Sequence, residues 1–142
     1  MKSLTRGLAA GVVGTTAMTA SQALEMRLTG RSGSDVPGQV AEEMTGIHPE
    51  NPQAKAAMST GMHWAHGIAG GGVRALIAKT GATGPLAGVL LFAGLWSMDA
   101  TLYRALKIAG SPWRWSKEDL ATDLFHKGLY SAATSAAFER LR

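Results

Sequence analysis

The chain has 142 residues, of which 46% are hydrophobic and only 17% are charged, and its net charge at pH 7 is +4. A typical soluble domain carries roughly 25% charged residues, and a disordered chain combines high charge with low hydrophobicity, so this composition excludes a disordered chain. There is no cysteine, which excludes a disulfide scaffold, and the basic residues form no run of the kind that binds nucleic acid.

Charged residues are absent from, or rare in, four long segments of the chain. Segments 7–24, 56–73 and 80–98 contain no Asp, Glu, Lys or Arg, and segment 120–138 contains few. About 20 helical residues cross the hydrocarbon core of a bilayer. A soluble helical bundle, the alternative, would show charged faces with a 3.6-residue period, and segments 7–24 and 80–98 show none. The sequence therefore predicts an all-α fold, a four-helix transmembrane bundle, in which 1–142 form one integral membrane domain.

Capping signals predict where the helices begin and end. Asn51 followed by Pro52 is a typical helix start, and Ser116 with Asp119 resembles a capping box. Glycines at 30, 46, 81 and 110 are the expected stops. The predicted helices cover residues 3–28, 36–45 (a short surface helix), 52–79, 85–109 and 117–141.

Local similarities indicate that the chain consists of two similar helical hairpins. Residues 7–12 resemble 84–89, and residues 63–67 resemble 123–128. A parallel repeat of this kind occurs in some transporters. Lys and Arg are divided six against seven between the two sides of the four spans, so the positive-inside rule leaves the orientation open.

Small residues recur at four-residue spacing, which is typical of closely packed membrane helices. Gly11, Gly67 and Gly88 each belong to such a pair and are expected at helix–helix contacts. The expected surroundings are the lipid bilayer, together with a second copy of the chain or a membrane-protein partner, and no nucleic acid.

Six ionisable residues lie within the predicted spans, where such groups are costly and usually face the bundle interior. At ~1.5 Å of rise per residue, the three deepest lie ~14–16 Å from the ends of their helices that face the two long loops, and two carboxylates lie ~8–9 Å from those ends. They are therefore expected to converge in one half of the bundle. The six are Glu25, His63, His66, Asp99, Asp123 and His126.

Their order along the chain resembles the ligand order of di-iron four-helix bundles, in which two helices give Glu and two give Glu-x-x-His. His63 replaces a Glu and two Asp replace Glu here. The six residues are therefore a candidate site for a metal ion or haem, with Gln22, Tyr103 and Tyr130 as supporting partners.

Two other interpretations stay open, namely proton or solute handling and ordinary polar packing. In the packing interpretation, Asp99 pairs with Arg104 or Lys107, and Asp123 pairs with Lys127.

Three patches resemble the YagU-like family of small, uncharacterised bacterial inner-membrane proteins. They are Gly11-x-x-Gly14-Thr-x-Ala-Met18, His63-Trp64-x-x-Gly67 and Asp123-x-x-His126-x-x-x-Tyr130. The resemblance implies a multi-pass location in the cell inner membrane and helical hairpins, and it implies no particular chemistry.

The sequence thus predicts an integral membrane protein with a structural or accessory role and a buried His/Asp cluster. The alternative is a metal- or haem-binding membrane protein. The standard motifs of soluble enzymes, such as the P-loop and His-Glu-x-x-His, are absent from the sequence, and an enzymatic activity is left open.

Overall fold

A computed structural model describes residues 3–141 and contains no strand in that range. Its elements, in chain order, are α1 (Ser3–Thr29), α2 (Val36–Thr45), α3 (Pro52–Ala78), α4 (Gly84–Ala105), a 3-10 turn η1 (Pro112–Arg114) and α5 (Lys117–Arg140). The predicted all-α fold is confirmed.

The predicted helix starts rest on caps that the structure contains. The side chain of Asn51 accepts a hydrogen bond of 2.8 Å from the backbone N–H of Ala54. Ser116 Oγ accepts one of 3.0 Å from the N–H of Asp119 and donates one of 2.6 Å to its carboxylate. These caps satisfy N–H groups that have no partner within the helix, and they fix where α3 and α5 begin.

The end of α4 differs from the prediction, which extended this helix to residue 109. The helix ends at Ala105 in a Schellman motif, because Lys107 adopts a left-handed conformation with φ of 58°. The N–H of Ile108 bonds to the carbonyl of Tyr103 at 2.9 Å, and that of Lys107 bonds to the carbonyl of Arg104 at 3.1 Å. Glycine is the usual residue in this conformation, so the stop was expected at Gly110 rather than at a lysine.

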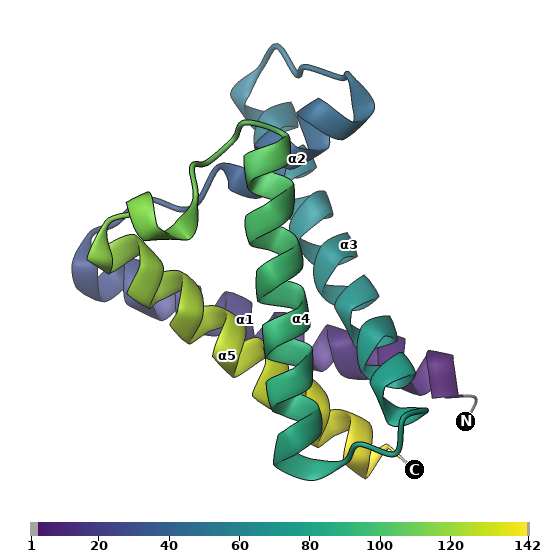
Figure 1. Ribbon diagram of the computed structural model, residues 1–142. Helices are drawn as coiled ribbons and strands as arrows, with labels where there is room; N and C mark the ends of the chain where they lie inside the picture. Colours follow the sequence, from purple (N-terminus) through teal and green to yellow (C-terminus); the bar gives the residue numbers. More distant parts are fainter. Residues whose placement is uncertain (1–2, 142) are drawn as a thin grey trace.

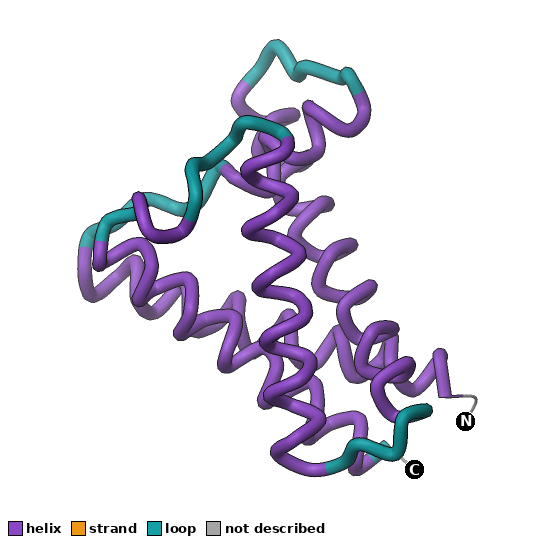
Figure 2. Tube along the Cα trace, viewed as in Figure 1, coloured by secondary structure: helices purple, strands orange, loops and turns teal. Residues whose placement is uncertain are grey.

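Helix α1 lies along both α3 and α5, and these two contacts are the most extensive in the structure. Helix α4 packs mainly on α5 and less on α3, and α2 folds back against α3 (Figure 1). The turn between α3 and α4 lies at the same end of the molecule as the end of α5, and the longer loops lie toward the other end (Figure 2). The sequence predicted that α1–α3 and α4–α5 are two similar hairpins. In that case α1 corresponds to α4 and α3 to α5, so the packing of α3 on α4 would be as extensive as that of α1 on α5. The structure does not show this equivalence.

Glycines bring α1 and α3 into backbone contact. A Cβ atom built on Gly11 would lie 2.8 Å from the carbonyl oxygen of Gly67, and one built on Gly71 would lie 2.7 Å from the Cα of Gly11. A Cβ on Gly88 would lie 3.6 Å from Ser135 Oγ, an ordinary contact between α4 and α5. The predicted placement of Gly11, Gly67 and Gly88 at helix contacts is confirmed, and the tightest approach to a backbone atom is between α1 and α3.

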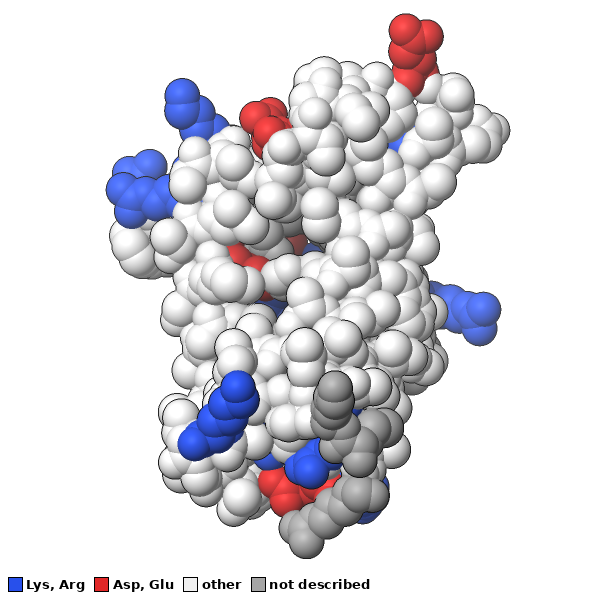
Figure 3. All heavy atoms as spheres, turned by 90° about the vertical axis from the view of Figure 1, so that its right-hand side faces the viewer, with Lys and Arg blue, Asp and Glu red and all other residues white. Residues whose placement is uncertain are grey.

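Hydropathy separates α4 from the other long helices. Within residues 3–141, α4 alone is long and apolar enough to be a candidate membrane span, with a mean hydropathy of 1.4 over its best window. Glycine, serine and threonine lower the hydropathy of the others, so hydropathy does not support the expected four spans. Charged side chains lie in a few separate places on the face drawn in Figure 3, with uncharged areas between them.

Candidate functional site

The six predicted site residues fall into two groups rather than one. His66, Asp99 and Asp123 meet Lys127 between α3, α4 and α5, and we call these four residues the ion cluster. Glu25, His63 and His126 line a separate cavity at the end of α1.

The ion cluster is centred on the carboxylate of Asp99, which is only 2% exposed. Lys127 Nζ lies 2.9 Å from Asp99 Oδ2 and 3.1 Å from Asp123 Oδ1. His66 Nε2 lies 3.1 Å from Asp99 Oδ1. A buried charge needs a close partner of opposite sign, and Lys127 supplies it for both carboxylates.

Aromatic side chains of α4 complete the ion cluster. Trp96 donates its indole N–H to Asp123 Oδ2 at 2.9 Å, and the ring of Tyr103 lies 5.2 Å from Lys127 Nζ. The predicted pairing of Asp123 with Lys127 is confirmed. Asp99 pairs with Lys127 and His66 instead of Arg104 or Lys107, because the interior side of α4 faces α5 and α3, whereas Arg104 reaches Ser111 in the following loop.

The cavity has a volume of about 260 Å³ and lies between α1, α3, α5 and the loop that follows α1. Most of the residues that line it have polar side chains, with hydroxyl groups, an amide, two imidazoles and the Glu25–Arg31 pair, beside the apolar Trp64 and Met26. The residues that line it are Thr19, Gln22, Glu25, Met26, Arg31, Ser32, Gly33, Ser34, Pro37, Ser59, Thr60, His63, Trp64, Thr122 and His126.

Ser21 of α1 contacts both its own helix and His126 of α5. Its hydroxyl lies 3.0 Å from the carbonyl oxygen of Met18 and 2.7 Å from His126 Nδ1, and the donor in the contact with His126 depends on the imidazole tautomer. The other ring nitrogen of His126 is Nε2. That Nε2 atom is buried, forms no hydrogen bond within the described residues, and faces Glu25 Oε2 at 3.9 Å.

Contacts around Glu25 hold the loop after α1 against α5. Its Oε1 atom accepts a bond of 3.0 Å from Thr29 and lies 3.9 Å from Arg31 Nη1. Arg31 in turn donates to Thr122 at 2.7 Å and to Asp119 at 3.2 Å. The other oxygen of Glu25, Oε2, is left facing His126.

The third cavity residue, His63, lies 2.9 Å from Thr19 Oγ1 through its Nε2 atom. Within residues 3–141, no three His, Asp or Glu side chains are arranged to share a metal ion. The structure therefore divides the predicted ligand set between two places. Of the expected supporting residues, Gln22 lines the cavity, Tyr103 lies beside Lys127, and Tyr130 donates to the carbonyl of Gly67 at 2.5 Å.

A buried arginine escaped the sequence analysis. Arg74 is fully buried and donates to Glu139 at 2.8 Å and to Ser135 at 3.2 Å. The guanidinium groups of Arg74 and Arg6 lie 4.4 and 3.7 Å from the centre of the Phe138 ring. An arginine two residues after the glycine run 70–72 in a helix was the available signal, because small neighbours let a second helix cover it.

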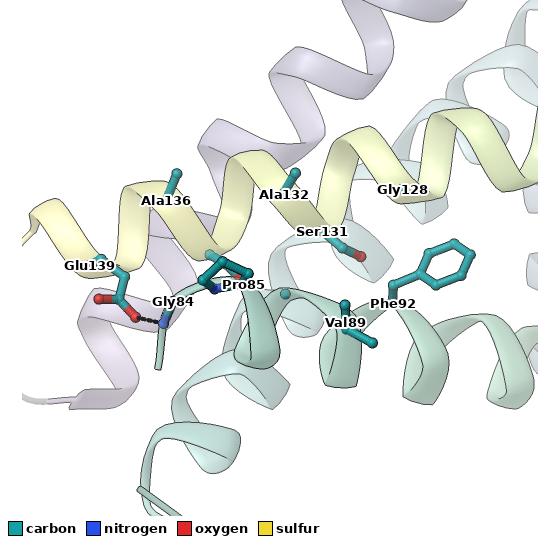
Figure 4. A pocket seen from close by; sticks show the side chains of 11 residues that line it. Gly84, Pro85, Val89, Phe92, Gly128, Ser131, Ala132, Ala136 and Glu139 are labelled. Carbon is teal, nitrogen blue, oxygen red and sulfur yellow. Dashed lines mark hydrogen bonds between the residues drawn. The ribbon is translucent and has the colours of Figure 1, made fainter. Parts of the chain in front are cut away.

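Glu139 also accepts the N–H of Gly84 at 2.9 Å, which links the start of α4 to the end of α5 (Figure 4). Beside this contact the two helices enclose a groove of about 570 Å³. Small residues of both helices line much of it, with Val89 and Phe92 on the α4 side (Figure 4).

No family model, no curated protein and no solved structure matches this chain.

Proposed function

We propose that the chain is a multi-pass integral membrane protein whose four long helices, α1, α3, α4 and α5, cross a bilayer. The proposal rests on one observation, the reversed distribution of polar and apolar side chains. In water, a fold gains most of its stability by burying large apolar side chains, and an extended exposed apolar surface marks a site of interaction with something other than water.

Large apolar side chains lie outside in this chain. Among the described residues, sixteen large hydrophobic side chains are exposed, including Leu28 at 77% and Phe125 and Val89 at 61% each. The buried set contains eight polar or charged residues beside nine hydrophobic ones, and Arg74, Thr15 and Thr134 are completely buried. In a hydrocarbon medium this arrangement is favourable, because polar side chains find partners inside and apolar ones contact lipid.

The structural or accessory role follows from how the interior polar groups are used. The Asp99–Lys127 pair joins α4 to α5, the Arg74–Glu139 pair joins α3 to α5, and Tyr130 bonds a carbonyl of α3. Polar side chains that bond across helices stabilise the packing of a membrane bundle. We assign the chain a scaffold role in a bacterial inner membrane, in line with its resemblance to the YagU-like family.

The haem alternative has less support. Pockets for drug-sized ligands measure roughly 300–1,000 Å³, and the cavity beside His63 and His126 measures about 260 Å³. A metal site that uses all six predicted residues would need the ion cluster and the cavity to merge.

Membrane fractionation tests the proposal directly. We expect the expressed chain to sediment with membranes, to resist extraction by sodium carbonate at high pH, and to enter solution only with detergent. Recovery as a soluble, monodisperse protein without detergent would refute it. A soluble oligomer that covers its apolar surface would also be recovered without detergent, and that result would refute the proposal as well.

Single-cysteine labelling tests the number of spans, and the natural sequence has no cysteine to interfere. Four spans place the exposed residues Glu50 and Trp113 on one side and Thr83 on the other. We expect a membrane-impermeant maleimide to label E50C and W113C together in intact cells or in inverted vesicles, and T83C only in the opposite preparation. If T83C and E50C label together, α3 does not cross the membrane.

A further inference from the structure

The groove between α4 and α5 has two unlike walls. The α4 wall carries the larger side chains of Val89 and Phe92. The α5 wall carries a stripe of small residues at four-residue spacing, Gly128, Ala132 and Ala136 (Figure 4). Both alanines are exposed, and a Cβ atom built on the glycine would meet no atom within 4 Å. In the part of the chain that the structure describes, this stripe is therefore left uncovered.

A buried hydroxyl on the same wall lacks a hydrogen-bond partner. Ser131 lines the groove and is 2% exposed, and its Oγ atom forms no hydrogen bond within the described residues (Figure 4). The neighbouring Tyr130 shows how α5 uses such a group, because its hydroxyl donates to the carbonyl of Gly67 on α3. A lipid acyl chain has no hydrogen-bonding group, whereas a helix offers backbone carbonyls with a second lone pair. The unpaired hydroxyl therefore favours a helix as the occupant of the groove.

We propose that the groove is the interface of a symmetric dimer, in which α4 of each copy packs against the small-residue stripe of the other. A two-fold axis brings the same surface of both copies together, so that surface must be complementary to itself. Large side chains on one wall and small ones on the other meet this condition, because the rotation places each wall opposite its counterpart.

Two contacts fix how α4 and α5 are aligned along their length. The N–H of Gly84 donates to Glu139 at 2.9 Å near one end, and the indole of Trp96 donates to Asp123 at 2.9 Å further along. The two helices therefore run in opposite directions, and positions between these contacts can be matched by interpolation.

The large and small residues of the groove lie at equal levels. By this interpolation Val89 is level with Ala132, and Phe92 is level with Gly128. Two copies that share one orientation in a membrane meet at equal levels, so each large side chain of one copy comes opposite a small residue of the other. This step rests on the proposed membrane location. Small residues at a membrane interface let helix backbones approach closely.

The end of the groove adds complementary charges. Arg140 is exposed and continues the stripe of Ala132 and Ala136 by one further four-residue step. Glu139 lines the groove, and its carboxylate reaches the start of α4 through its bond with Gly84. Because the stripe of one copy faces the α4 wall of the other, Arg140 of each copy comes opposite Glu139 of the other. Opposite charges in an interface fix its register and disfavour other partners.

Disulfide crosslinking tests the interface, since the natural chain has no cysteine. Two differently tagged copies, one with V89C and the other with A132C, are expressed together and oxidised in the membrane. We expect a disulfide between the copies, which requires Cα atoms no more than about 7 Å apart. The control pairs V89C with A121C, which lies ~16 Å further along α5 and should give little crosslink. No crosslink in the test pair, or equal yields in both pairs, would overturn the proposal.

The same crosslink separates this proposal from the membrane proposal. If the chain sediments with membranes and the test pair does not crosslink, the dimer proposal alone fails. If the chain is soluble and the test pair still crosslinks, the dimer stands and the membrane location fails.

The mass of the purified protein in detergent gives a second readout. A132L fills the small-residue wall and should give monomers at a concentration at which the parent is dimeric. Its matched control is A20L, which enlarges an exposed alanine of α1 outside the groove and should stay dimeric. S131A should weaken association about threefold to tenfold through one lost interhelical hydrogen bond. Circular dichroism checks that each variant remains helical.

Three results of the mass measurement contradict the dimer. They are a dimeric A132L, an A20L that dissociates as readily as A132L, and a monomeric parent that retains a lipid. The last result would assign the groove to an acyl chain.

Discussion

Replacement of Gly71 by alanine should force α1 and α3 apart. A Cβ atom on Gly71 would lie 2.7 Å from both the Cα and the N of Gly11, which are backbone atoms that cannot rotate away. Inserting a group into a packed contact costs about 1–3 kcal/mol. Alanine is more favourable than glycine in a helix by up to about 1 kcal/mol. The net loss of unfolding free energy is therefore the cost of the clash reduced by this gain.

Gly61→Ala is the matched control, because Gly61 lies in the same helix and a Cβ there would meet no atom within 4 Å. This variant should be unchanged or more stable by up to about 1 kcal/mol. The measurement is the free energy of unfolding in mixed detergent micelles, followed by circular dichroism. If G71A unfolds at the same denaturant concentration as G61A, the close approach of α1 and α3 contributes nothing and the reasoning is wrong.

Five further substitutions test three interior polar contacts by the same unfolding assay. D99N and K127M should each cost up to about 3–5 kcal/mol, because each removes one member of the buried Asp99–Lys127 pair, and the double variant should cost clearly less than the sum; additive losses would contradict a direct pair. R74M should cost about 3 kcal/mol because it leaves Glu139 unpaired, and E139Q should recover part of that loss when added to it. Y130F should cost about 1–3 kcal/mol through the lost bond to α3, and a neutral result would mean that water replaces it.

Helix positions could be predicted from the sequence because they depend on local signals. Asn51 and Ser116 cap the helices whose starts they predicted. The end of α4 could not be placed, since Lys107 adopts a conformation that the sequence assigns to glycine. Capping chemistry is readable from a few neighbouring residues, but a strained residue is held by the surrounding structure.

Depth along a helix was predictable, but partner choice was not. His63 and His126 do share a cavity, as their similar depths indicated, whereas Asp99 belongs to another cluster. Which residues meet depends on how each helix is rotated about its axis, and helices rich in glycine and alanine give little amphipathic signal to fix that rotation. The same weakness hid the partner of Arg74.

The order in which partners become available during synthesis follows from the packing. Helix α1 can pair with α3 as soon as both have been made, but α4 is completed before α5, its main partner. In a bilayer, a newly inserted segment without a partner must be apolar enough to remain there unaided. Helix α4, which is made before its main partner, is the one with the highest hydropathy. The less apolar α1 and α3 can pack together as soon as both have been made. For the proposed membrane protein, exchanging the apolar content of α3 and α4 would therefore impair insertion even if the finished packing were unchanged.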